Sequence, residues 1–178
     1  YILSGKLTDG QIVVSVEKTE KVQLVLENVE VTNSSSAAIY VTSADKVAIT
    51  LTEGSTNKFT DGSTYSGQKE KGEPNACIFS KDDLTINGYG TLIVKGNYNN
   101  GISTTNDLKI VSGVIEVSAK NNALKGKDSF LVNSGKITVN SDDDGIKVSE
   151  TDDPAKGFIC IEGGEITVSY THLRAHET

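Results

Sequence analysis

The sequence has no methionine or tryptophan, two prolines, and only 6% aromatic residues. The only arginine, Arg174, and both histidines, His172 and His176, lie in the last seven residues. No apolar run approaches the ~18 residues of a membrane-spanning helix, and no Cys/His set has zinc-site spacing. These absences argue against long helices, membrane insertion and a structural zinc ion. The net charge of −7 argues against nucleic acid as a partner.

Two cysteines, Cys77 and Cys160, are too few for a disulfide framework. In the repeat derived below they lie three coils apart, which is about 14 Å at ~4.8 Å per coil. Two Cα atoms more than ~7 Å apart cannot be bridged. We therefore predict two unpaired thiols.

The last ten residues differ in composition from the rest, because 16 lysines and no arginine precede them. Residues 169–178 look like a translated sequencing adapter, and an ordinary basic tail is the alternative. We predict a β-helix domain over residues 1–168 and a non-native tail over 169–178. Since the chain opens on Tyr1 without a signal-like stretch, we expect the natural protein to begin upstream.

An internal repeat of about 22 to 25 residues runs through the chain. Leu84, Leu108 and Phe130 begin equivalent apolar alternations and are 24 and 22 residues apart. Each unit has three short alternating runs bounded by Gly, Asn, Asp or Ser, which is the pattern of strands. One unit cannot bury its apolar face, whereas stacked parallel units bury a continuous column. The sequence predicts an all-β, right-handed parallel β-helix (solenoid) of about six coils.

Two alternatives to this fold fit the sequence less well. An antiparallel sandwich would not repeat the same glycine and apolar offsets four times. A left-handed helix of hexapeptides needs a strict six-residue step, which is absent. Residues 60–75 and 149–157 lengthen two turns, so we expect surface loops that either frame a binding face or have no function.

Polar turn residues should stack in columns once the coils are in register. Carboxylate and amide oxygens at ~5 Å vertical spacing are suitable ligands for calcium, which takes six to eight oxygens. A solvated acidic turn is the alternative, because Asn and Asp also serve turn geometry. The predicted calcium ligands are Asp142, Asp143, Asp144, Asn121 and Asn122, with a second column of Asp82, Asp107 and Asp128.

Lys125 and Lys147 are 22 residues apart and should lie one above the other on an outer face. Two such cations beside the acidic turn could bind the carboxylates of an acidic polysaccharide. The alternative to a binding role is that the two lysines simply lie on a solvated strand. Tyr98 and Asn100, in a neighbouring turn, are further candidates for contact with a sugar.

Four motifs in the same order carry a resemblance to a bacterial family of carbohydrate-binding domain proteins. They are AAIYV at 37–41, DLTING at 83–88, NYNNGI at 97–102 and DDGIK at 143–147. The resemblance covers residues 22–168. It implies a pectate-lyase-like β-helix that binds acidic plant cell-wall polysaccharide such as polygalacturonate (pectin), with bound Ca²⁺. It also implies a secreted or cell-surface protein without demonstrated lyase activity, with more Asp-Gly-Ile coils after residue 168.

Catalysis is disfavoured by the residue types present. A lyase needs a base to remove the C5 proton of a uronate, and outside the tail there is no arginine or histidine. We expect the acidic neighbourhood to raise the pKa of Lys125 and Lys147. The predicted function is therefore a non-catalytic carbohydrate-binding module. A lyase-like enzyme and a purely structural surface stalk are the alternatives.

Overall fold

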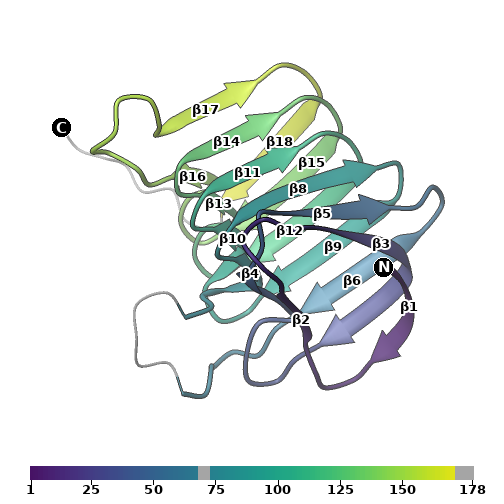
Figure 1. The fold of residues 1–178 in the computed structure, drawn as a ribbon. Coiled ribbons are helices and arrows are strands. Elements are labelled where there is room, and N and C mark those ends of the chain that lie inside the picture. Colours follow the sequence, from purple (N-terminus) through teal and green to yellow (C-terminus); the bar gives the residue numbers. More distant parts are fainter. Residues whose placement is uncertain (68–72, 171–178) are drawn as a thin grey trace.

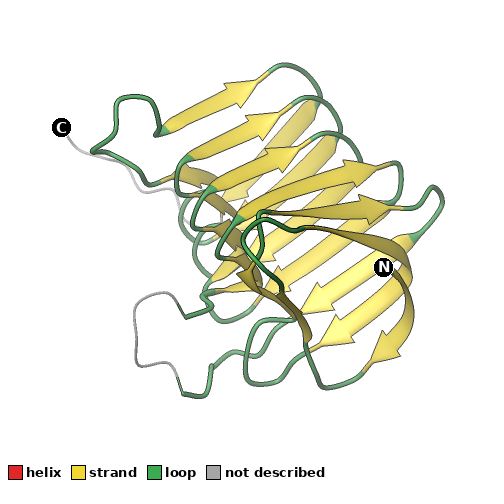
Figure 2. Cartoon of the chain, in the orientation of Figure 1, coloured by secondary structure: helices red, strands yellow, loops and turns green. Residues whose placement is uncertain are grey.

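The computed structural model describes residues 1–67 and 73–170, which form the stacked turns of a right-handed parallel β-helix (Figure 1). Each strand pairing in these ranges is parallel. Figure 2 shows strands and loops throughout the described part of the chain. These ranges contain no helix that could cross a lipid bilayer. The predicted fold is confirmed.

The coils present three faces, each a ladder of parallel strands. The first face contains β3 (Lys21–Thr32), β5 (Lys46–Leu51), β8 (Asp83–Gly88), β11 (Asp107–Ile110), β14 (Ser129–Val132) and β17 (Phe158–Ile161). The second contains β6 (Thr56–Thr60), β9 (Thr91–Gly96), β12 (Val114–Ala119), β15 (Lys136–Ser141) and β18 (Glu165–Tyr170), and β3 bends round to join it. The third contains β2 (Ile12–Ser15), β4 (Ile39–Ser43), β7 (Ala76–Ser80), β10 (Asn100–Thr104), β13 (Leu124–Gly126) and β16 (Ile146–Val148).

The strand β1 (Ile2–Leu7) pairs with β3 and, with β2, adds a turn at the N-terminal end. The helix therefore has about seven turns rather than the predicted six. The sequence repeat did not indicate this turn, because residues 1–15 do not reproduce the spacing of glycine and apolar residues that the later coils share. Leu3 of β1 and Ile12 of β2 nevertheless pack against the core.

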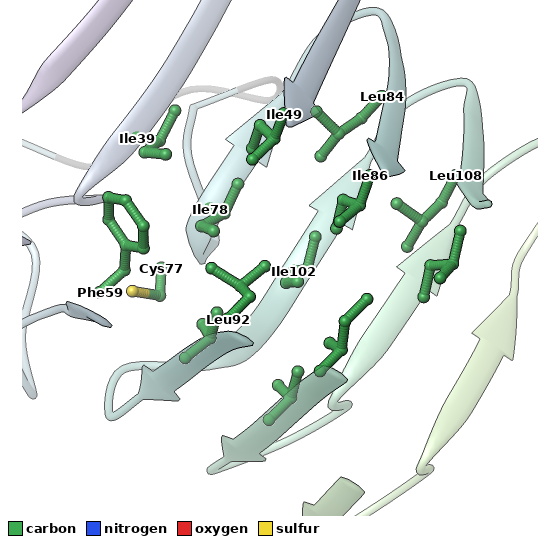
Figure 3. Packing of buried hydrophobic residues seen from close by; sticks show 14 of the residues in the cluster. Ile39, Ile49, Phe59, Cys77, Ile78, Leu84, Ile86, Leu92, Ile102 and Leu108 are labelled. Atoms are coloured by element: carbon green, nitrogen blue, oxygen red, sulfur yellow. The ribbon is translucent and has the colours of Figure 1, made fainter. Parts of the chain in front are cut away.

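The core is a set of apolar columns that run along the helix axis. On the first face Leu84, Leu108 and Phe130 lie in register and are at most 1% exposed. Figure 3 shows side chains from this face, such as Ile49 and Ile86, in the interior together with Ile78 and Ile102 of the third face. Each column buries apolar area in proportion to the number of coils, so stability comes from stacking.

A column of glycines forms the corner between the first and second faces. Gly113, Gly135 and Gly164 have φ of 113°, 110° and 94°. A Cβ on Gly135 would lie 2.8 Å from the carbonyl oxygen of Gly113. Asn28, at φ 58°, makes the equivalent bend within β3, since Asn tolerates the left-handed region. The repeated glycine is therefore required by backbone conformation and by close stacking.

We expect Gly135→Ala to lower the free energy of unfolding by about 2 kcal/mol, because a left-handed conformation and a clash with backbone combine. Urea denaturation followed by circular dichroism would measure this. Gly5→Ala is the control, since Gly5 has φ 96° but nothing within 4 Å of the added Cβ. Equal losses in both variants would contradict a role for the close approach.

The two predicted insertions differ in how much of them is described. The 149–157 loop is mostly exposed and is tied to the coil before it by two ion pairs. These are Lys156 to Asp128 (2.8 Å) and Lys127 to Glu150 (3.4 Å). Of the 60–75 insertion, residues 68–72 lie outside the described residues.

Cys77 and Cys160 are both free, as predicted. Of the predicted tail, Ser169 and Tyr170 belong to β18, and residues 171–178 lie outside the described residues. The assignment of 169–178 as non-native therefore stays a prediction.

Candidate functional site

The turns that connect the second face to the third face carry a ladder of asparagines. We call these turns, residues 97–99, 120–123 and 142–145, the asparagine corner. The Nδ2 of Asn100 donates to the backbone oxygen of Asn75 (3.1 Å). The Oδ1 of Asn100 accepts hydrogen bonds from the backbone N–H and the Nδ2 of Asn122 (3.2 and 2.9 Å). Asn100 and Asn122 are 1% and 2% exposed.

The prediction that Asn100 contacts a sugar is therefore wrong. Its side chain is buried, and both of its polar atoms bond to neighbouring coils. A buried polar group that is fully hydrogen-bonded contributes to the structure, and exposing it to a ligand would break those bonds. Asn100 is a ladder residue.

The ladder stops at Asn122, whose Oδ1 is buried without a hydrogen-bond partner in the described chain. Because its N–H and Nδ2 both face Asn100, this oxygen faces the next coil. The register places Asp144 there, and the N–H of Ala123 donates to its carbonyl oxygen (3.0 Å). An ionised carboxylate has no proton to donate, so it cannot continue the ladder.

The acidic turn at 142–144 forms ion pairs with two lysines. Lys120 Nζ lies 3.7 Å from Asp142 Oδ2, and Lys147 Nζ lies 3.9 Å from Asp143 Oδ2 and 2.9 Å from Asp144 Oδ2. The hydrogen bond to Asp144, followed by the charges of both carboxylates, raises the pKa of Lys147. Lys147 therefore stays charged at neutral pH, as predicted.

The predicted calcium ligands divide into those that the fold brings together and those that it separates. The N–H of Asp143 donates to the carbonyl oxygen of Asn121 (3.2 Å), so this pair joins Asn122 and Asp144 at the corner. Carboxylate and amide oxygens are the donor type that calcium prefers. Across residues 1–67 and 73–170, no three His, Cys, Asp or Glu side chains are grouped to hold a metal ion.

The expected column of Asp82, Asp107 and Asp128 is wrong in register at Asp107. Asp107 pairs with Ser129, whose Oγ donates to its Oδ1 (2.6 Å). Asp128 lies one residue earlier and pairs with Lys156, while Asp82 bonds to Lys18 on another coil. The apolar residues that follow fix the register, and they align Asp107 with Asp83.

Lys125 and Lys147 do stack on the outer side of the third face, in β13 and β16. Lys125 is half-buried and lines a pocket of about 320 Å³ with Phe79 and Ser103, which occupy the same position in earlier coils. Burial, and then the charge of Lys147, lower the pKa of Lys125. The expectation of a raised pKa is wrong for Lys125, because no carboxylate of the described residues pairs with it.

Tyr98 lies in the asparagine corner and stacks on Tyr65, with ring centroids 4.1 Å apart and 17° between planes. The carboxylate of Asp61, which is 3% exposed, lies 2.5 Å from the Tyr65 hydroxyl and accepts the N–H of Asn97 at 2.5 Å. Burial raises the pKa of Asp61 despite these hydrogen bonds. The sequence pattern did not indicate Asp61, because the 60–75 insertion interrupts the repeat.

The fold and this corner define a parallel β-helix protein with a polar, charged surface at the turns between its second and third faces. Residues 1–172 match the family model described as carbohydrate-binding domain-containing protein. The chain belongs to this family.

A carbohydrate-binding domain-containing protein of Acetivibrio thermocellus is 48% identical over 169 residues, which cover 94% of this chain and 59% of the relative. The chain therefore spans about three fifths of that relative's length. A solved structure described as the polysaccharide lyase-like protein from C. thermocellum, a gadolinium derivative, matches with a TM-score of 0.92 and 47% identity. The match covers 94% of this chain and 68% of that one.

Proposed function

We propose that this chain is a non-catalytic module that binds an acidic plant cell-wall polysaccharide of the polygalacturonate type, assisted by calcium. The observation that carries the proposal is the Lys125–Lys147 column beside the acidic turn at 142–144. We also propose that the protein works outside the cell, secreted or at the surface, because its ligand is there.

Lys125 supports the choice of an anionic ligand. A half-buried ammonium without a carboxylate partner has lost hydration and gained no ion pair, so an incoming carboxylate would bind it well. Neighbouring coils are about 4.8 Å apart, close to the length of one sugar in a linear chain. Successive uronates could therefore meet Lys125 and Lys147 in turn.

Calcium is supported by the donor set at the corner. Asp143, Asp144 and the unpaired Oδ1 of Asn122 would supply hard oxygens, and uronate carboxylates and water could complete the six to eight that calcium takes. The similar structure is a gadolinium derivative, and Gd³⁺ is likewise a hard, oxygen-seeking cation. Calcium would neutralise the turn and leave Lys147 available to the ligand.

The test is binding to polygalacturonate by isothermal titration calorimetry, with calcium and with excess EGTA. We expect Lys125→Gln to weaken binding about tenfold, which is about 1.4 kcal/mol. Lys109→Gln is the matched control, because Lys109 lies on the first face between Thr85 and Leu131. An equal effect of both variants, or none of Lys125→Gln, would contradict this site.

A lyase is the second candidate, and Lys125 is the observation that favours it. A lysine with a lowered pKa beside calcium could remove the C5 proton of a uronate. Against this, Lys147 keeps a raised pKa beside it, and the described residues include no arginine. Ultraviolet absorbance from an unsaturated product, lost in Lys125→Gln, would establish the enzyme and contradict the module.

A further inference from the structure

A hollow of about 720 Å³ lies on the second-face side of the asparagine corner, and it shares no residue with the Lys125 pocket. It is continuous with a smaller groove over β9, β12 and β15, since Ser118 and Asn140 line both. The residues that line the hollow are Ser63, Gly96, Asn97, Tyr98, Ser118, Ala119, Lys120, Asn140 and Asp142.

The lining repeats along the helix axis. Ser118 pairs in register with Asn140 of the next coil. At the corner, the N–H of Lys120 donates to Gly96, and the N–H of Asp142 donates to Ala119, so three coils contribute equivalent positions. Because neighbouring coils are about 4.8 Å apart, a linear polymer lying along the axis would meet a similar surface at every coil.

The charges in this lining cancel. Among the described residues that line the hollow, the one cation and the one anion are Lys120 and Asp142, which pair with each other at 3.7 Å. The other polar groups are hydroxyls and side-chain amides, which donate and accept hydrogen bonds without charge. The Lys125 pocket is also lined by Glu73 and Lys127, but among the described residues no carboxylate pairs with Lys125. A neutral, hydroxyl-rich ligand therefore fits the hollow better than a polyanion does.

The ring of Tyr98 is held in place before any ligand arrives. Tyr65 stacks on it and does not line the hollow. The Tyr65 hydroxyl lies 2.5 Å from Asp61 Oδ2 and 2.9 Å from the carbonyl oxygen of Ala76. The Nδ2 of Asn97, the residue before Tyr98, donates to the carbonyl oxygen of Asp61 (2.7 Å). A rigid aromatic side chain loses little conformational entropy on binding.

We propose that this hollow is a second sugar subsite, in which the apolar face of a neutral pyranose stacks on Tyr98 and its hydroxyls bond to Asn97, Ser118 and Asn140. Asp61 and Tyr65 are positioning residues that hold the tyrosine ring. The inference rests on the proposed function, because it takes the chain to be a polysaccharide-binding module. It adds that one corner binds charged sugars on its third-face side and neutral sugars on its second-face side.

The test compares Tyr98→Ala and Tyr98→Phe in calorimetric titrations with neutral linear hexasaccharides (cellohexaose, xylohexaose and mannohexaose) and with polygalacturonate. We expect Tyr98→Ala to weaken binding of at least one neutral hexasaccharide tenfold or more, and Tyr98→Phe to stay within threefold of the wild type. Polygalacturonate affinity should change less than threefold in both variants. Circular dichroism shows whether each variant is folded.

Three outcomes would overturn the subsite. They are no neutral sugar bound by the wild type, an unchanged affinity in Tyr98→Ala, or a loss confined to polygalacturonate. If the wild type binds a neutral sugar through Tyr98 but does not bind polygalacturonate, the subsite stands and the proposed acidic ligand fails. If Lys125→Gln loses polygalacturonate while Tyr98→Ala changes nothing, the proposed function stands and the subsite fails.

Discussion

Replacing Asn100 with alanine is expected to lower the free energy of unfolding by about 3 kcal/mol. The substitution removes the acceptor of two hydrogen bonds from Asn122, a residue that is 2% exposed. A buried donor left without a partner costs ~1–3 kcal/mol, and the bond from Asn100 Nδ2 to Asn75 is lost as well. Urea denaturation followed by circular dichroism would measure the change.

Asn87→Ala is the matched control for this loss. Asn87 lies at the end of β8, is only half-buried, and its outward position does not belong to the ladder. We expect its effect to stay within about 0.5 kcal/mol, as for most surface substitutions. A loss below 1 kcal/mol in Asn100→Ala, or a similar loss in the control, would contradict the ladder as a source of stability.

Asp144→Asn is expected to change stability in opposite directions with and without calcium. In excess EGTA, the introduced amide can donate to the unpaired Oδ1 of Asn122. This gain should exceed the loss of the partly exposed ion pair to Lys147 and raise the free energy of unfolding by about 1 kcal/mol. With calcium at about 100 times its Kd, the wild type should gain about 2.7 kcal/mol. The variant should lose most of that gain, because one carboxylate ligand is gone.

Thermal unfolding in EGTA and in calcium, on both proteins, would measure the reversal. Asp152→Asn is the control, since it makes the same charge change in the exposed 149–157 loop. A wild type that calcium does not stabilise would contradict the calcium site. A variant no more stable than the wild type in EGTA would contradict the interrupted ladder. The two parts therefore fail separately.

Much of the fold could be predicted because the spacing between repeats shows which residues of neighbouring coils lie in register. The spacing of Leu84, Leu108 and Phe130 predicts that they stack, and they do. The same spacing placed Lys125 above Lys147. Register between coils is set by apolar columns, whose burial provides the driving force, so residues at a fixed distance from a column residue are predictable.

The candidate site was predictable only where it follows that register. Asp143 and Asp144 were found beside Asn121 and Asn122, as the spacing predicts. Asp107 and Asp128 were not aligned, because Asp107 lies one residue before its column residue Leu108, whereas Asp128 lies two residues before Phe130. Asn100 was misassigned because a sequence does not reveal whether a turn asparagine points outward or into a ladder.

The spacing and polarity of the residues were sufficient to predict the parallel β-helix, its alternating core and the stacking of equivalent positions. These properties follow from period and polarity, which are local and repeated. Spacing and polarity were not sufficient to predict which polar side chains are buried and hydrogen-bonded between coils and which are accessible to a ligand. Asn100 is buried, and Tyr98 stacks on Tyr65 of an interrupted coil. Among the described residues, the Oδ1 of Asn122 has no hydrogen-bond partner and Lys125 has no carboxylate partner. Each outcome depends on side-chain contacts between coils, which no spacing along the chain encodes.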